Sequence, residues 1–345
     1  MNKEVYNFET GMYRPPSEGG SSSLLVRFTR NCPWNRCAFC AMYKTEKFEI
    51  RSLSEICADI DQMTSIRDEL ESISEKSWIK KGKISRSGAG ELIRRHPELQ
   101  YLPGFPMLFE FLVSGGKTAF LQDGNSIIMK TPDLVEALHY LRASFPAISR
   151  VTTYARSRTI AQKKPADLQA IREAGLDRLH VGLETGDDEL LSAINKGVSA
   201  EDHVKAGRKA MEAGFQLSEY WMPGLGGKDG WENHAQRTAS VLSAINPHYI
   251  RSRPFRPIPS TPLHEAWSRG EMALQTEKEQ LRELRLTIDD LDVTSRLCFD
   301  HAGNAWRDGA GRLLFTHDYE GYRFPDEKPR LLERIDRALA NGRNR

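Results

Sequence analysis

Three cysteines stand within nine residues of one another, at positions 32, 37 and 40. Their spacing is Cys-x4-Cys-x2-Cys, in the segment RFTRNCPWNRCAFCAMYK. Three thiolates on one tight loop can bind three corners of a [4Fe–4S] cluster. The fourth iron is then open to a ligand that is not protein. The residue types and their spacing therefore favour an iron–sulfur site.

Zinc binding and dithiol redox chemistry account for less of this cysteine pattern. A structural zinc ion usually takes four protein ligands, and no CxxC partner or nearby histidine stands in the sequence. A dithiol redox pair of Cys37 and Cys40 would leave Cys32 unexplained, and a chance cluster of thiols is the third alternative. Cys57 and Cys298 are too few for a second cluster held by protein alone. An odd total of five cysteines argues against a disulfide framework.

The cysteine loop follows a short apolar strand, SLLVRF, and a helix is expected over 51–63. From residue 117 onward, apolar strand segments alternate with helical segments. Six strands are expected, at 23–28, 118–122, 150–155, 178–183, 216–222 and 248–254. The intervening helices are expected at 132–145, 164–175, 187–195, 200–213 and 231–245. This order predicts an α/β fold of parallel βα units, either an open doubly wound sheet or a partial barrel.

The remaining segments do not follow this alternation. Residues 1–22 are predicted to form an irregular arm, and 64–115 a mostly helical insertion that contains the basic run 76–83. Residues 266–345 are predicted to be a C-terminal extension. Within it we expect two helices and one hairpin, at 268–291, 328–342 and 305–315. Its polar side chains either line a substrate site or form an ordinary polar hairpin: His301, His317, Asp318, Tyr319 and Tyr322.

Polar motifs stand directly after the predicted strands, where barrels of parallel strands build their sites. They are LQDGNS at 121–126, TTYARSRT at 152–159, HVGLETGDDELLSAINKG at 180–197, EYWMPGLGG at 219–227 and IRSRPFRPIPSTPLHE at 250–265. The first is also compatible with a plain turn, and the third with a helix N-cap near Glu184. Arg251 and Arg253 alternate on the last strand and either face an anionic substrate or pair with acidic neighbours.

The cysteine loop and these motifs together resemble the radical S-adenosylmethionine (SAM) superfamily. The resemblance is to the branch of oxygen-independent coproporphyrinogen oxidase, the Elongator catalytic subunit and the methylthiotransferase cores. An aromatic residue, Phe39, directly precedes the third cysteine, as in that family. The first gap departs from the common pattern, because four residues rather than three separate Cys32 from Cys37. The resemblance implies a partial (β/α)6 TIM-type barrel over 23–265.

The resemblance also implies a set of site residues. Cys32, Cys37 and Cys40 would hold the cluster. Asp123 would accept from the SAM ammonium, Glu184 would bind the ribose hydroxyls, and Lys196 would contact the SAM carboxylate. The full set of implied SAM contacts is Phe39, Asp123, Gly124, Tyr154, Arg156, Glu184, Lys196, Gly224 and Gly226.

The implied function is cleavage of SAM to a 5′-deoxyadenosyl radical that abstracts hydrogen from a small molecule. A flavodoxin or ferredoxin would supply the electron. We also consider a non-catalytic haem or cluster carrier and an RNA-modifying enzyme. A net charge of +2 leads us to expect no nucleic-acid partner. The absence of long apolar runs and of a signal-like N-terminus leads us to expect a cytoplasmic protein without membrane contact.

Overall fold

The computed structural model describes residues 5–11, 22–44, 46–76 and 83–341. The chain forms two compact units. Unit 1 comprises 1–33, 47–154 and 166–178, and unit 2 comprises 34–46, 155–165 and 179–345. The predicted division at residues 22 and 265 remains a prediction.

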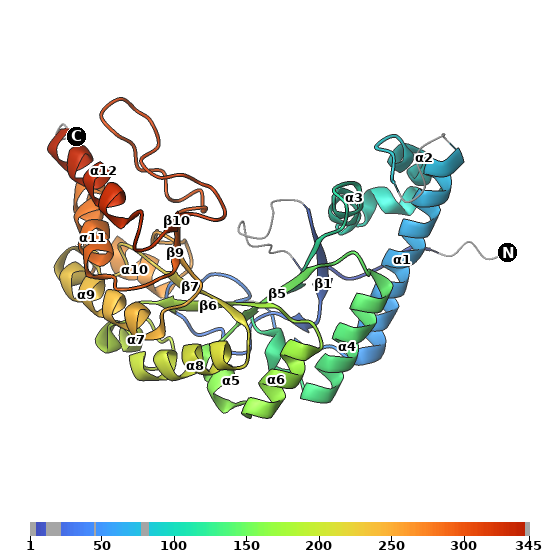
Figure 1. Ribbon diagram of the computed structural model, residues 1–345, viewed down its shortest axis with the longest axis horizontal. Helices are drawn as coiled ribbons and strands as arrows, with labels where there is room; N and C mark the ends of the chain where they lie inside the picture. The colour runs from blue at the N-terminus through green and yellow to red at the C-terminus, as the bar shows by residue number, and fades with distance from the viewer. Residues whose placement is uncertain (1–4, 12–21, 45, 77–82, 342–345) are drawn as a thin grey trace. The chain divides into compact units, whose positions relative to one another are not determined.

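Unit 1 is built on three parallel strands in the order β1-β4-β5. Ser23 of β1 pairs with Thr118 of β4, and Thr118 pairs with Arg150 of β5. Helices α1 and α4 pack side by side in this unit (Figure 1). The bounds are β1 (Ser23–Arg27), β4 (Thr118–Gln122), β5 (Arg150–Ala155), α1 (Leu53–Lys76), η2 (Ser126–Ile128), α4 (Thr131–Ser144) and α6 (Pro165–Glu173).

A separate antiparallel pair, β2 (Thr29–Arg30) and β3 (Glu49–Ile50), flanks the cysteine loop. Thr29 pairs with Ile50 and Arg30 with Glu49. Each strand has only two residues, too few to produce a recognisable alternation in the sequence. The pair brings together the two ends of the segment that carries the cysteines.

The insertion is helical, as predicted, but its first part continues the preceding helix. Helix α1 does not end near residue 63 but runs to Lys76. Its buried residues, among them Ile66 and Leu70, continue the apolar stripe of the first turns. The later elements are α2 (Gly88–Arg95), η1 (Pro97–Tyr101) and α3 (Phe105–Val113). The basic run 76–83 lies, except for its two ends, outside the described residues.

Unit 2 carries the strand order β6-β7-β8-β9-β10. The parallel pairing of β7 with β8 places Tyr220 opposite Arg251. All six predicted strands are therefore found, three in each unit. The strands of unit 2 are β6 (Arg178–Glu184), β7 (Gln216–Trp221), β8 (Tyr249–Ser252), β9 (Arg296–Cys298) and β10 (Tyr322–Arg323).

Several helices of unit 2 begin at capping side chains. Ser199 and Asp202 form a capping box at the start of α8, and Thr276 and Glu279 do the same for α11. The predicted helix 268–291 was too long at its start, because this cap begins it at residue 277. The bounds are α5 (Ser157–Gln162), α7 (Asp188–Ala193), α8 (Ala200–Glu212), α9 (Gly227–Ile245), α10 (Pro262–Ser268), α11 (Glu277–Asp290) and α12 (Lys328–Asn341).

The C-terminal extension adds two strands to the sheet of unit 2. Strand β9 runs parallel to β8, and β10 runs antiparallel to β9. The predicted hairpin at 305–315 is reduced to a single antiparallel bridge between Arg307 and Leu313. These additions were missed because β9 and β10 have three and two residues.

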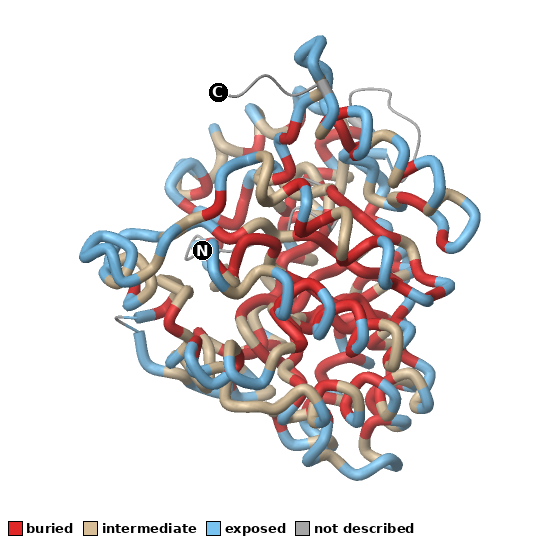
Figure 2. Tube along the Cα trace, turned by 90° about the vertical axis from the view of Figure 1, so that its left-hand side faces the viewer, coloured by how far each residue is buried: buried red, intermediate tan, exposed pale blue. Residues whose placement is uncertain are grey.

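Buried residues follow the strands and the inner sides of the helices (Figure 2). Val26, Phe120 and Leu217 are fully buried, as expected for strands covered by helices. The predicted α/β fold of partial TIM type is confirmed, and within the described residues no closed barrel is found. No helix in the described part of the chain has the length and apolar character needed to cross a membrane.

Candidate functional site

Asp123 fastens the start of the cysteine loop in unit 1. Its Oδ2 atom accepts the Asn31 backbone N–H at 3.0 Å. The same atom accepts the Arg27 Nε–H at 2.6 Å, and the Asp123 side chain is fully buried. The Gly124 backbone N–H in turn donates to the Asn31 carbonyl at 3.2 Å. Asp123 was predicted to accept the SAM ammonium. In the structure its carboxylate accepts from Arg27 and from the backbone of the cysteine loop.

Gly124 brings the chain directly against the first cysteine. A Cβ atom at residue 124 would lie 3.1 Å from the Cys32 Cβ and 3.4 Å from its Sγ. Such distances are tighter than ordinary contacts, so glycine is the residue that this approach accepts most readily. Gly124 was predicted to be a SAM contact, and in the structure its backbone lies against Cys32.

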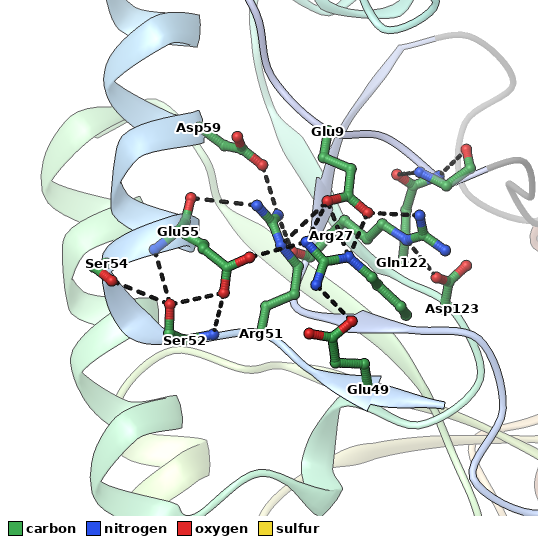
Figure 3. Close-up of polar contacts among 12 residues, drawn as sticks. Glu9, Arg27, Glu49, Arg51, Ser52, Ser54, Glu55, Asp59, Gln122 and Asp123 are labelled. Atoms are coloured by element: carbon green, nitrogen blue, oxygen red, sulfur yellow. Dashed lines mark hydrogen bonds and ion pairs between the residues drawn. The ribbon is translucent and has the colours of Figure 1, made fainter. Parts of the chain in front are cut away.

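A network of arginines and carboxylates supports the start of the loop (Figure 3). Glu9 accepts from Arg27 at 2.7 Å and from Arg30 at 2.6 Å. Hydrogen bonding to Arg30 lowers the pKa of the Glu9 carboxyl. Arg51 is buried and pairs with Asp59 at 2.6 Å. Glu9 belongs to the predicted irregular arm, and its role could not be inferred from local sequence.

The second half of the cysteine loop belongs to unit 2. The Ala38 N–H donates to the Ile194 carbonyl at 2.8 Å, and the Ala38 carbonyl accepts from Leu263 at 3.1 Å. Phe39 packs against the buried apolar cluster of Ile194, Leu225 and Phe255. The Cys40 N–H donates to the Cys37 carbonyl at 3.2 Å, which closes a tight turn between these cysteines. Backbone bonds on both sides thus hold this part of the loop.

Glu184 and Lys196 form an ion pair in unit 2. The Lys196 Nζ lies 2.7 Å from the Glu184 Oε1, and each side chain is 12% exposed. Burial, the largest single effect, opposes the charge of Lys196, but the Glu184 carboxylate and the charge of Cys37 together outweigh it, so the pKa of Lys196 is raised. The ammonium also lies 5.9 Å from the centre of the Phe39 ring. Three of the predicted SAM contacts are therefore brought together.

Gly182 makes room for this ion pair. A Cβ at residue 182 would lie 2.1 Å from the Glu184 Oε1 and 2.9 Å from the Lys196 Nζ. Glu184 itself adopts a φ of 66°, in the left-handed region that non-glycine residues rarely occupy. Strain of this kind is concentrated at functional sites. The Gly-Leu-Glu order of residues 182–184 is the sequence signal for this feature, and Gly182 was not among the residues predicted from it.

The other predicted contacts lie as follows. Arg156 donates through Nη2 to the Lys196 carbonyl at 2.8 Å. Tyr154 belongs to unit 1, where its ring meets Phe120 edge-on at 5.4 Å. Gly224 has a φ of 87°, which glycine tolerates best. A Cβ at Gly226 would lie 2.8 Å from the Gly230 carbonyl oxygen, so tight packing at the start of α9 accounts for that glycine.

A buried polar network lies behind Glu184 and the Gly224 turn. The His234 Nε2–H donates to the Met222 carbonyl at 3.0 Å, and its Nδ1 accepts the Thr185 hydroxyl at 2.7 Å. Burial lowers the pKa of His234 to about 4. Glu283 accepts the Gly224 N–H at 2.7 Å, and burial raises its pKa to about 7. His234 and Glu283 are therefore both neutral between these values, and their 3.5 Å contact is not an ion pair there.

Substituting Glu283→Gln is expected to change the pH dependence of stability. Between its ordinary pKa of 4.5 and about 7, Glu283 is ionised in the unfolded chain and protonated in the folded one. The wild type therefore loses stability as pH rises through this window, by about 3 kcal/mol in total. The glutamine oxygen still accepts the Gly224 N–H but cannot ionise.

Urea unfolding of both proteins at pH 4.5 to 8 measures this effect. The stability of the variant relative to the wild type should increase up to about pH 7 and then stay constant. His234 acts in the opposite direction below 6.5, where its folded pKa is lowered, but it is present in both proteins. A stability difference that does not vary with pH would show that the pKa of Glu283 is not raised in the folded protein.

Arg251, Arg253 and the polar residues of the C-terminal extension contact other residues of the protein. The sequence had left open whether they do so or face a substrate. Arg251 is fully buried and pairs with Asp300 at 3.0 Å, the commoner fate of a strand arginine. Arg253 lies over the Tyr220 ring at 4.5 Å. In the extension, His317 bonds to the Asn304 carbonyl, and the Tyr322 hydroxyl accepts the Thr316 N–H. These contacts fit an ordinary packed extension as well as a substrate site.

The cysteine donor set fits an iron–sulfur cluster by its chemistry. The described residues contain no group of three His, Cys, Asp or Glu side chains already arranged to hold a metal ion. Cys32 belongs to unit 1, and Cys37 and Cys40 belong to unit 2. All three are partly exposed, and none is in a disulfide. Three accessible thiols on one loop are the ligands that such clusters require.

Comparison with known proteins identifies the class. Residues 107–235 match the family model of the radical SAM superfamily. The match confirms the predicted resemblance to that superfamily and the prediction of an enzyme. Enzymes of this superfamily use a [4Fe–4S] cluster and SAM. The matched range includes Glu184 and Lys196, but it begins after the three cysteines.

Individual relatives are distant. The tRNA uridine(34) acetyltransferase of Methanocaldococcus jannaschii is 26% identical over 117 residues, which are 33% of this chain and 21% of the relative. This chain thus matches about a fifth of the length of the curated relatives. Methylornithine synthase has a TM-score of 0.47 at 18% identity, covering 80% of this chain and 66% of that chain. For coproporphyrinogen III oxidase from Escherichia coli the score is 0.46 at 16% identity, covering 77% and 51%.

The expectation of no nucleic-acid partner is not supported by these relatives. Net charge was its basis, and a chain with a net charge near zero can still carry local basic surface.

Proposed function

We propose that this chain cleaves SAM at a [4Fe–4S] cluster held by Cys32, Cys37 and Cys40. The supporting observation is the position of Lys196, whose Nζ lies 2.7 Å from Glu184 and 5.9 Å from the Phe39 ring. Phe39 stands between two of the cysteines, so the unit 2 half of the loop and the ion pair share one neighbourhood.

Each residue has a role suited to its chemistry. Lys196 provides a buried cation for a carboxylate, and Glu184 provides two oxygens that accept from a pair of hydroxyls. The Gly224 turn offers backbone that can approach a ligand closely. When bound, a reduced cluster would supply the one electron needed for reductive cleavage of SAM, and hydrogen abstraction from the substrate would follow.

We place part of the substrate in a cavity of unit 2 of about 310 Å³. Its walls combine apolar rings with two amides, and they include Phe255, Trp306, Gln275 and Gln280. Gln275 is 7% exposed, and its amide lies close enough to the Glu283 carboxyl to act on its pKa, which it lowers against the effect of burial. A lining of this mixed kind favours a ligand with hydrogen-bonding groups as well as apolar surface. A small polar molecule meets that requirement.

RNA modification is the second candidate. It is favoured by the curated relatives, which are named as tRNA uridine(34) acetyltransferases. Binding to RNA that weakens steeply with added salt would support it. A small-molecule enzyme would show no such binding.

The test is anaerobic reconstitution with iron and sulfide, followed by addition of SAM and a reductant. We expect absorbance at about 400 nm from thiolate–iron bonds and formation of 5′-deoxyadenosine. A protein that assembles its cluster but leaves SAM intact would exclude the proposed activity and favour a carrier.

A further inference from the structure

The longer first gap of the cysteine motif contains a tryptophan that is bound to the Lys196 turn. The Trp34 Nε1–H donates to the Asn195 carbonyl at 2.7 Å. Asn195 directly precedes Lys196, and Trp34 stands three residues before Cys37. All of these residues belong to unit 2. One side chain thus links the loop of the cysteines to the turn that carries the predicted SAM-binding lysine.

The turn is shaped to receive the indole. Gly197 has a φ of 77°, and a Cβ there would lie 2.4 Å from the Trp34 Cζ2. No other residue fits at 197 without displacing the ring, because both the conformation and the space favour glycine. The sequence Asn195-Lys196-Gly197 therefore provides a carbonyl acceptor and an open surface on the two sides of Lys196.

Two arginines complete the contact. The Arg156 guanidinium lies 4.8 Å from the centre of the Trp34 ring and also donates to the Lys196 carbonyl at 2.8 Å. Arg36, from the same gap, lies 5.2 Å from the ring centre. Cation–π contacts of this kind are favourable, especially where they are partly shielded from water. Arg156 thus holds the Lys196 turn and the indole at the same time.

We propose that Trp34 is a positioning residue that couples the cysteine loop to the SAM-binding turn. The inference rests on the proposed function, and it gives a role to the four-residue gap, which contains Trp34. Displacement of the indole shifts the Lys196 turn relative to Cys37. SAM affinity and the electronic state of the cluster therefore both depend on it.

The test compares Trp34→Ala and Trp34→Phe with the wild type. Trp267→Ala serves as a matched control, because Trp267 is 42% exposed and lies on α10. Each reconstituted protein is assayed for iron content, for SAM affinity by equilibrium dialysis, and for the change in its electron paramagnetic resonance spectrum on adding SAM. We expect Trp34→Ala to lose about tenfold in SAM affinity, as for other residues that orient ligand groups. Its spectrum with SAM should also differ from that of the wild type.

Trp34→Phe keeps an aromatic ring but loses the N–H bond, so its affinity should be intermediate. If Trp34→Ala does not fold, the SAM affinity and the spectrum of Trp34→Phe still test the proposal. Gly197→Ala should lower SAM affinity as Trp34→Ala does, because the added methyl group displaces the indole. Wild-type affinity and spectra in both Trp34 variants would overturn the proposal, even with SAM cleavage intact. A wild type that fails to cleave SAM would instead refute the proposed function.

Discussion

Replacing Cys32, Cys37 or Cys40 by alanine is expected to prevent cluster assembly and abolish formation of 5′-deoxyadenosine. Each of the three thiolates binds one iron, and two protein ligands do not hold a cluster with one open site. Iron and sulfide per chain, and the absorbance at about 400 nm, report assembly. Product analysis by chromatography reports SAM cleavage.

Cys57→Ala is the matched control for these variants. Cys57 lies in α1, and burial raises the pKa of its thiol, so it is a poorer metal ligand than a thiolate. This variant should keep full iron content and activity. Retention of the cluster in any one of the three loop variants would show that the corresponding cysteine is not a ligand.

Replacing Lys196 by methionine is expected to destabilise the fold and to weaken SAM binding. The substitution leaves the Glu184 carboxylate 12% exposed and without its 2.7 Å partner. Breaking a buried ion pair in this way costs about 3 to 5 kcal/mol. Because the Glu184 side chain is only 12% exposed, water cannot fully replace the lost ammonium.

The double variant Glu184→Gln/Lys196→Met separates stability from binding. Removing both charges should restore most of the lost stability, as measured by urea unfolding, because no uncompensated charge remains. SAM affinity should stay low in both variants. Lys205→Met is the matched control, since Lys205 forms an exposed ion pair with Glu201 at 2.6 Å. Lys205→Met should change neither the stability nor the SAM affinity. Equal effects of the substitutions at Lys205 and Lys196 would contradict the proposed role of Lys196 in SAM binding.

The strands could be predicted well from the sequence, because each is a short apolar run between turn or cap residues. Prediction failed where a local pattern was weak or ambiguous. Nothing between residues 63 and 76 ends a helix, and α1 runs through that stretch. The Thr-x-x-Glu signature at 276–279 marks the true start of α11, whereas the predicted helix began at residue 268. Strands β9 and β10 are too short for any pattern.

The site was predictable to the extent that its residues lie close in sequence. Glu184 and Lys196 are twelve residues apart in one motif, and the structure pairs them. The partners that fix other residues come from remote segments: Arg27 reaches Asp123 across 96 residues, and Glu283 reaches Gly224 across 59. Such contacts depend on tertiary packing, so the roles of Glu9, His234 and Glu283 emerge only in the fold.

The most direct test of SAM cleavage by this chain is a quantitative assay on the reconstituted wild type under strict exclusion of oxygen. We expect formation of 5′-deoxyadenosine that depends on the cluster, on the reductant and on all three loop cysteines. Omitting the reductant, or using the Cys37→Ala variant, should leave SAM intact. A fully assembled and reduced cluster that produces no 5′-deoxyadenosine, or cleavage that persists in Cys37→Ala, would contradict the proposed activity.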